Sequence, residues 1–210
     1  MYKRQVFAYV ADGLLQPGEE APAHQPQLLP GQVKLKNING DDKLNEEDMV
    51  LIGRNDPKFI FGFNNNFSYK NFDLNIYMYG QVGKIAGANS YYDAWGSYGN
   101  RIKLGQNVPV SFKDAWSSDN QTSTRPSFIE SAYGTGDLFL QKISFLRIRN
   151  ITLGYTVPIS KSICNRLRVY ADVNNPCVWT NWKGQDPETD SNTNAYPNVT
   201  SFSIGVDISF

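Results

Sequence analysis

The sequence predicts an all-β fold of antiparallel strands, and three observations favour a β-barrel of the outer-membrane type. Apolar residues recur at every second position in several segments, which is the period of a strand. Short connections alternate with long polar ones, as the turns and loops of such barrels do. The chain contains 12 Tyr and 12 Phe, yet its mean hydropathy is negative. A sheet with one apolar and one polar face produces that combination.

The composition excludes several other classes. With 20 basic and 20 acidic residues, the chain lacks the basic surface of a nucleic-acid binder and the acid excess typical of disorder. It also lacks the run of about 18 uncharged apolar residues that a membrane helix needs. The start, MYKRQ, has no apolar core of a signal peptide, and we expect residues 1–5 to mark a fragment boundary.

The clearest strand pattern is a hairpin. Phe63, Phe67 and Tyr69 alternate with small or polar residues, and the alternation resumes at Phe72. A two-residue turn at Lys70-Asn71 would place Tyr69 opposite Phe72, so that both strands agree on their apolar face. A slip of one residue would destroy that agreement. The residues expected on the opposite, polar face include Asn64, Asn66, Asp73, Asn75 and Tyr77.

Further strands are expected at 6–10, 145–155, 166–174 and 198–210. In 145–155 the apolar positions change parity, which predicts a bulge near Asn150. The long polar connections are then residues 11–57, 82–142 and 175–197. Loops of that length are uncommon in a compact domain and are usually functional. A secreted β-sandwich also alternates, but it explains neither the alternating loop lengths nor the aromatic residue Phe210 that closes the last strand.

Residues 37–48 have the spacing of an EF-hand-type calcium loop. Asp42 stands where such loops usually carry Gly, and Asn37 stands where they usually carry Asp. Asp48 is also shorter than the usual bidentate Glu. The residues therefore leave two alternatives, a structural calcium ion that stiffens the loop or an ordered turn without metal. The six candidate ligands are Asn37, Asn39, Asp41, Lys43 (through its carbonyl), Asn45 and Asp48.

The sequence contains no catalytic constellation. His24 is the single histidine, which excludes a plausible Ser/His/Asp set, and there is no phosphate-binding glycine loop. Asp186 and Glu188 place two carboxylates together, but exposed acids usually serve solvation. We expect no enzymatic activity, and no cofactor apart from the calcium ion under consideration.

Aromatic residues gather in the long connections. Flat rings next to Asn and Asp are suited to stacking on sugars or to packing against a protein lid, and the alternative is that they pack within the loops. The candidates are Tyr91, Tyr92, Trp95, Tyr98, Trp116, Trp179 and Trp182.

Several blocks of the chain, in the right order, resemble one family. Residues 30–83, LRIRNITLGYTVP (146–158), RVYADVNNP (168–176), KGQDPE (183–188) and the terminal ISF resemble the C-terminal region of SusC/RagA-family TonB-dependent outer-membrane transporters of Bacteroidota. The resemblance implies that the chain is a C-terminal segment, about six antiparallel strands, of a large transmembrane β-barrel of about 22 strands. The plug and the TonB-contacting part would lie upstream.

The resemblance also implies a function and an orientation. The whole protein would import oligosaccharides or peptides across the outer membrane, with a SusD-like surface lipoprotein and the TonB complex as partners. The connections 11–57, 82–142 and 175–197 would be extracellular, the apolar face would meet lipid, and the polar face would line the lumen. Cys164 and Cys177 would then lie at opposite ends of a strand, too far apart for a disulfide.

The terminal Phe210 has an expected role of its own. An alternating last strand that closes on an aromatic residue resembles the signal read by the barrel-assembly machinery. Two other functions stay open: a secreted calcium-dependent carbohydrate-binding β-sandwich, and a passive porin without a plug.

Overall fold

The computed structural model describes residues 4–87, 105, 107, 110–128, 134–159, 164–184, 186–189 and 196–210. These residues are nearly all β, as predicted, with two short 3-10 helices, η1 (Glu46–Asp48) and η2 (Val110–Asp114). The chain forms two compact units. The first is built mainly from Met1–Asp56 and Ile85–Gln141, and the second from Pro57–Lys84, Lys142–Thr189 and Asn194–Phe210.

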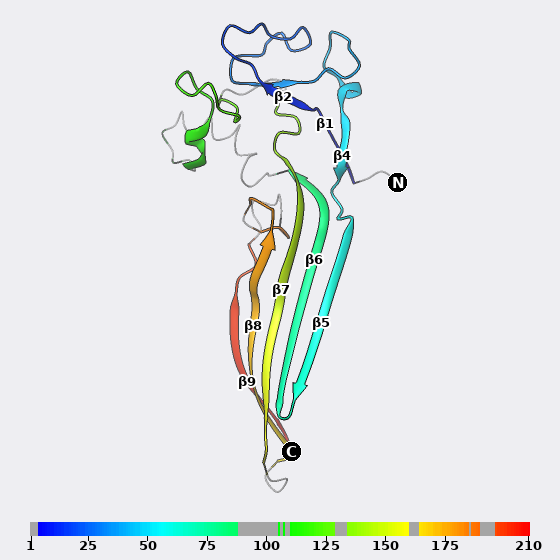
Figure 1. Ribbon diagram of the computed structural model, residues 1–210, viewed down its shortest axis with the longest axis vertical. Helices are drawn as coiled ribbons and strands as arrows, with labels where there is room; N and C mark the ends of the chain where they lie inside the picture. Colours follow the sequence, from blue (N-terminus) through cyan, green and yellow to red (C-terminus); the bar gives the residue numbers. More distant parts are fainter. Residues whose placement is uncertain are drawn as a thin grey trace. The chain divides into compact units, whose positions relative to one another are not determined.

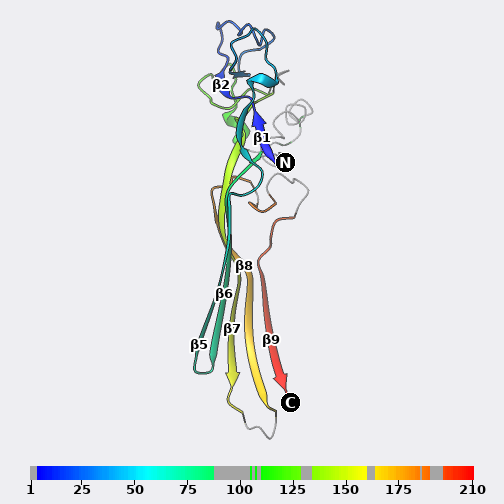
Figure 2. The same ribbon diagram turned by 90° about the vertical axis from the view of Figure 1, so that its right-hand side faces the viewer.

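The second unit is a five-stranded sheet. Its strands are β5 (Phe59–Tyr69), β6 (Phe72–Gly87), β7 (Leu140–Val157), β8 (Arg166–Thr180) and β9 (Ser201–Ser209), neighbours in chain order. The β5–β6, β7–β8 and β8–β9 pairs are antiparallel. The β5–β6 turn and the C-terminus lie at the same end of the sheet (Figure 1), with β5 and β9 at its two edges (Figure 2).

The hairpin has the predicted register. Tyr69 lies opposite Phe72 and Phe63 opposite Met78, without a shift along the whole pair. The two-residue turn requires Lys70 to adopt a φ of 53°, a left-handed conformation that is unfavourable for a residue with a Cβ atom. The apolar alternation therefore sets the register, although the turn itself is not built from favoured turn residues.

The sheet has two chemically distinct faces. On the apolar face the side chains are exposed, reaching 57% for Phe67 and 83% for Ile204. Phe72 and Tyr155 on this face bring their ring centroids within 4.7 Å. The apolar face comprises Phe63, Phe67, Phe72, Leu153, Tyr155, Val169, Phe202, Ile204, Val206 and Ile208, and the polar face comprises Asn64, Asn66, Asp73, Asn75, Tyr77, Asn150, Thr152, Arg168, Asp172, Asn174 and Asp207.

The predicted bulge is confirmed. The β7–β8 register shifts between Ile148, which pairs with Cys177, and Asn150, which pairs with Asn174. Asn175, within the shift on β8, has a φ of 49°, a conformation that Asn tolerates better than most residues. The irregularity lets β7 change the parity of its apolar positions without exposing the wrong face.

The strands are longer than the sequence predicted. β6 continues to Gly87, β7 begins at Leu140 and β8 continues to Thr180, so the connections predicted at 82–142 and 175–197 are shorter than expected. The added residues alternate less clearly, because Gly83 and the β7–β8 bulge interrupt the pattern. Cys164 and Cys177 are both free, as predicted.

The first unit corrects the prediction of one long connection at 11–57. That stretch contains β2 (Ala11–Leu14), β3 (Val33–Leu35) and β4 (Val50–Arg54). The strand expected at 6–10 is β1 (Gln5–Ala8), and it pairs with β4 in a separate two-stranded sheet instead of joining the five-stranded sheet. These strands are three to five residues long, too short to show a clear period in the sequence.

A small apolar core holds β2 and β3 together. Leu14, Val33 and Leu35 are buried, and Trp116 packs against them. Within the described part of the chain, no helix is long and apolar enough to cross a membrane.

Candidate functional site

The polar face carries a network of amide hydrogen bonds between β5 and β6. The Asn75 Nδ2 group donates to Asn64 Oδ1 at 2.7 Å and to Asn66 Oδ1 at 2.6 Å. These residues face one another because the unbroken register brings alternate positions of both strands to one side. The structure thus brings together the predicted polar positions, with Tyr77 opposite Asn64 and Asp73 one step from the turn.

A second network joins β7 and β8. The Asp172 carboxylate accepts from Thr152 Oγ1 at 2.6 Å, from Asn174 Nδ2 at 2.7 Å and from Asn150 Nδ2. All its described partners are neutral donors. The polar face therefore holds a carboxylate by hydrogen bonding alone, which leaves its charge uncompensated by these contacts.

An arginine ties three strands together near the β5–β6 turn. Arg168 on β8 donates to Asp73 on β6 through Nε (2.9 Å) and Nη2 (2.6 Å), and to Asp207 on β9 through Nη1 (3.0 Å). The side chain must cross β7 to reach Asp73. It does so over Gly154, where an added Cβ would lie 2.4 Å from Arg168 Nη2 and 2.5 Å from Asp73 Oδ1. The absence of a side chain at this position makes the forked contact possible.

At the other end of β7, charged groups are buried. The Arg147 and Asp186 side chains are each 3% exposed, and Arg147 Nη2 donates to Asp186 Oδ1 at 2.8 Å. Asp186 also accepts from the backbone N–H groups of Glu188 and Asn198, both at 2.9 Å. Burial on its own would raise the pKa of Asp186, but these N–H groups and the charge of Arg147 hold the pKa below its ordinary value.

Glu188 extends the cluster. It accepts from Arg149 Nη2 and from Asn198 Nδ2, both at 2.6 Å, and lies 3.5 Å from Arg147 Nε. The Arg149 guanidinium lies over the Tyr79 ring, 5.6 Å from its centroid. Two arginines and two carboxylates therefore balance in charge, as buried ionic groups require.

The calcium-like loop is ordered by its own hydrogen bonds. Asp48 is fully buried and accepts from the backbone N–H groups of Ile38 (2.7 Å), Asn39 (3.3 Å) and Asn45 (3.0 Å). The hydrogen bond from Asn45, more than those from Ile38 and Asn39, keeps the pKa of Asp48 below its usual value, although burial acts in the opposite direction. Asp48 also completes a capping box for η1.

The remaining candidate ligands serve the same turn. Gly40 N–H donates to Asn37 Oδ1 at 2.7 Å, Asp41 N–H to Asn39 Oδ1 at 3.0 Å, and Lys43 N–H to Asp41 Oδ1 at 2.8 Å. The left-handed residue is Gly40, with a φ of 77°, and not Asp42, the position at which EF-hand loops place their Gly. No group of three or more His, Cys, Asp or Glu residues in the described part of the chain is placed to hold a metal. These contacts account for the order of the loop without a cation.

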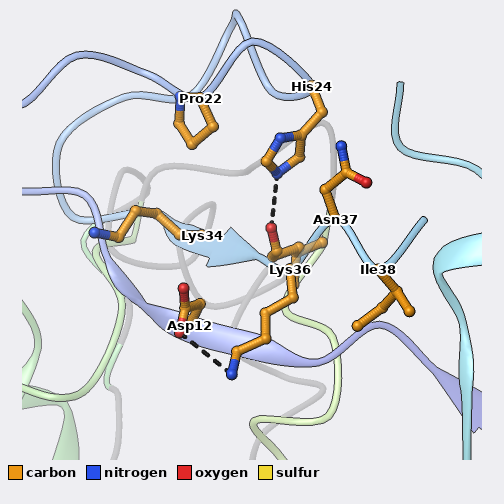
Figure 3. A pocket seen from close by; sticks show the side chains of 8 residues that line it. Asp12, Pro22, His24, Lys34, Lys36, Asn37 and Ile38 are labelled. Atoms are coloured by element: carbon orange, nitrogen blue, oxygen red, sulfur yellow. Dashed lines mark hydrogen bonds and ion pairs between the residues drawn. The ribbon is translucent and has the colours of Figure 1, made fainter. Parts of the chain in front are cut away.

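A hollow lies beside this loop. It measures about 440 Å³ and is lined by His24, Lys34, Lys36, Asp12 and their neighbours (Figure 3). His24 Nε2 is 2.8 Å from the Leu35 carbonyl oxygen, and Lys36 lies 3.7 Å from Asp12. The cations near the hollow already have acidic partners, since Lys34 also pairs with Glu19 at 2.5 Å.

The described aromatic candidates have different environments. Trp116 packs on the core of the first unit, and its Nε1 donates to Gln16 Oε1 at 3.4 Å. Trp182 is 6% exposed. Trp179 is exposed and lies within β8, opposite Leu146. Tyr91, Tyr92, Trp95 and Tyr98 lie outside the described residues, and a ligand role for any of the aromatics stays a prediction.

Sequence reasoning missed the two arginines that organise the polar face. Arg168 and Asp207 stand at polar positions of two alternating strands and lie directly opposite each other, so a register between these strands would have found that pair. The role of Arg147 follows only from its contact with Asp186, and no sequence pattern indicates that contact because the two residues lie 39 positions apart.

No family model matches this chain. Among curated proteins, it is 28% identical over 201 residues to TonB-dependent receptor P3 of Formosa agariphila, a match that covers 86% of this chain and 19% of that receptor. It is 27% identical over 180 residues to TonB-dependent receptor SusC of Bacteroides thetaiotaomicron, covering 82% and 17%. The chain thus spans about a fifth of the length of the curated relatives it matches. The predicted resemblance to SusC-type receptors is confirmed, and none of these names is that of an enzyme.

Solved structures show the same fold. The RagAB peptide transporter matches with a TM-score of 0.72 at 21% identity, covering 98% of this chain and 22% of that one. The RagAB peptide importer in the 'closed-closed' state matches with a TM-score of 0.67. The described strands therefore adopt the fold of a portion of the RagAB peptide transporter.

Proposed function

We propose that this chain, similar in sequence to SusC-type TonB-dependent receptors, forms part of the barrel wall of an outer-membrane nutrient importer. The observation that carries the proposal is the exposed apolar face of the sheet. Phe202, Ile204 and their neighbours present a contiguous apolar surface, which water disfavours and a bilayer accommodates. Tyr69, Phe72 and Tyr155 near the β5–β6 turn suit the aromatic girdle at a membrane interface.

The polar face supports the proposal that the sheet borders a water-filled passage. In a barrel it lines the lumen, where the amides of Asn64, Asn66 and Asn75 meet water and passing cargo. Phe210 stays a proposed assembly signal. The loop at 37–48 keeps both alternatives, a structural calcium site or an ordered turn without metal, and its internal hydrogen bonds support the second.

The proposed cargo and partners are based on the similar proteins. SusC-type likeness favours oligosaccharides, and the RagAB structures, named as a peptide transporter, favour peptides. A SusD-like surface lipoprotein and the TonB complex would be the partners, the latter acting through a part of the protein outside this chain. The secreted β-sandwich gains no support, because the described residues of the apolar face are not covered by a second sheet.

Substitution of neighbouring residues on opposite faces tests this proposal. Phe63→Arg places a charge on the apolar face, and Asn64→Arg, its matched control, places the same charge on the polar face. A lipid-facing arginine costs about 2–4 kcal/mol near the bilayer midplane. We expect the full-length protein with Phe63→Arg to be lost from the outer-membrane fraction, and Asn64→Arg to assemble. Recovery of the unsubstituted protein in a detergent-free soluble fraction would overturn the proposal.

A further inference from the structure

Burial in the second unit is concentrated at one end of β7. Apart from Cys164, Pro187 and the glycines, its buried residues among those described are Ile143, Phe145, Arg147, Trp182 and Asp186. Three of these alternate along β7, and the other two belong to the segment that follows β8. The described residues of this segment, 181–184 and 186–189, therefore cover one face of β7, at the end of the sheet opposite the β5–β6 turn, whereas the side chains nearer the turn stay largely open.

The covered face is the polar one. The ring centroid of Phe145 lies 6.0 Å from that of Tyr79, and Arg149 lies over the same Tyr79 ring. Tyr79 follows Asn75 and Tyr77 in steps of two along β6, so it belongs to the polar side of the sheet. Phe145, Arg147 and Arg149 are thus on that side, and Leu146 and its cross-strand partner Trp179 are on the other.

The covering segment is held by one carboxylate. Asp186 accepts from Arg147 on the wall and, through Oδ2, from both the backbone N–H and the side-chain amide of Asn198, at 2.9 and 3.2 Å. Asp186 therefore links the residues that follow β8 to Asn198, which precedes β9, and holds both against β7. Opening of the segment would take both Asp186 and Glu188 away from Arg147 and leave a buried arginine without these charge partners, which makes opening unfavourable.

We propose that the described residues of this segment lie on the lumen side of the barrel wall and narrow the passage at its outer end, with Asp186 as the residue that positions them. The inference rests on the proposed function, since the polar face borders a passage only if the sheet is a barrel wall. Glu188 reinforces the position through Arg149. The segment then restricts the size of cargo as a fixed part of the wall.

Limited proteolysis of the full-length protein in outer membranes tests the attachment. Lys183 is exposed within the segment, and trypsin needs the flanking residues to open before it can cleave there. Asp186→Asn removes the charge while keeping the shape, and should accelerate cleavage after Lys183 about tenfold or more, because breaking one side of a buried ion pair is strongly destabilising. Asp56→Asn, in the exposed pair with Arg4, is the matched control and should leave the rate unchanged.

A second variant keeps the test valid if the Asp186→Asn protein does not assemble in the membrane. Glu188→Gln removes the outer ion pair and should raise the cleavage rate in the same direction, by a smaller factor. Equal cleavage rates in the unsubstituted protein and both variants would overturn the attachment.

Conductance tests the inward position. The purified full-length protein is inserted into planar lipid bilayers, and its passage is opened with a low concentration of urea. The conductance of single channels is then recorded. Asp186→Asn should give larger channels than the unsubstituted protein and Asp56→Asn. Channels of equal conductance would overturn the inward position while leaving the proposed function intact. A lack of channels and of outer-membrane insertion in every variant would overturn the proposed function itself.

Discussion

The two units treat apolar side chains in opposite ways. In the first unit, Leu35 is 2% exposed and packs with Leu14 and Val33 in a core shielded from water. In the second, Leu153 is 49% exposed on a face that the described residues leave uncovered. The same residue type is thus placed for a protein interior in one unit and for an external apolar medium in the other. The first unit thus contains an apolar core of its own, whereas the sheet leaves apolar side chains outside any core that the described residues form.

The largest expected effect comes from one substitution made in both units. Leu35→Ala should lower the free energy of unfolding of the first unit by about 2–5 kcal/mol, because it leaves a cavity in a closed core. Leu153→Ala leaves no enclosed cavity and should change stability far less. Thermal unfolding of the full-length protein in detergent, followed by proteolysis of each unit, measures both. Equal losses would contradict the distinction between the units.

A smaller effect is expected within the sheet. Gly154→Ala places a methyl group where Arg168 crosses β7 and should cost about 1–3 kcal/mol through overpacking. Gly62→Ala is the matched control, since its Cβ would meet nothing closer than 3.5 Å. The loss of stability is measured as the temperature at which the full-length protein changes its mobility on gel electrophoresis. A Gly154→Ala protein as heat-resistant as Gly62→Ala would show that the arginine contact does not need this glycine.

Acidification should affect the turn at residues 37–48. The pKa of Asp48 is lowered in the folded chain, chiefly by the backbone N–H of Asn45, so its contribution to stability is present above its unfolded value of about 3.9 and is lost as pH falls through the lower folded value. Hydrogen exchange of the Ile38 and Asn39 amides should therefore become less protected below pH of about 4. Asp48→Asn should weaken protection already at neutral pH and remove this pH dependence; an unchanged pH profile would contradict the role of the carboxylate.

The smallest effect is expected at the β5–β6 turn. Replacing Lys70 by Gly keeps the left-handed conformation but removes its steric cost of about 1–2 kcal/mol, and it adds a backbone entropy cost of about 0.5–1 kcal/mol. The net result of these two terms should be a stabilisation of up to about 1.5 kcal/mol. Urea denaturation of the full-length protein, compared with Lys58→Gly just before β5 as a control, measures the change. A loss of stability in Lys70→Gly would contradict the turn geometry.

Long alternating strands could be predicted from the sequence, and short strands could not. The register of the β5–β6 hairpin was predicted to the residue because many alternating positions agree on it. By contrast, β2 and β3 have four and three residues, too few to define a period, and they form through contacts distant along the chain. The same alternation predicts the residues on the polar face of this hairpin, which are Asn64, Asn66, Asp73, Asn75 and Tyr77.

The buried Arg147–Asp186 pair could not be predicted in this way. Neither residue departs from its surroundings in the sequence, and their contact depends on how the segment after β8 returns to β7. Asp186 in isolation suggested a solvated acid, whereas its 3% exposure makes it the anchor of the segment. Burial of a charge is a tertiary property, and the pattern along one strand does not contain it.

A cysteine scan of β9 tests the central claim most directly. Each residue from 202 to 208 is replaced by Cys in a full-length protein with Cys164→Ser and Cys177→Ser, and the cells are treated with a water-soluble maleimide. Positions 202, 204, 206 and 208 should resist labelling because lipid covers them, and positions 203, 205 and 207 should react from the lumen. Uniform labelling along the strand would contradict the assignment of one face to the bilayer and the other to the lumen.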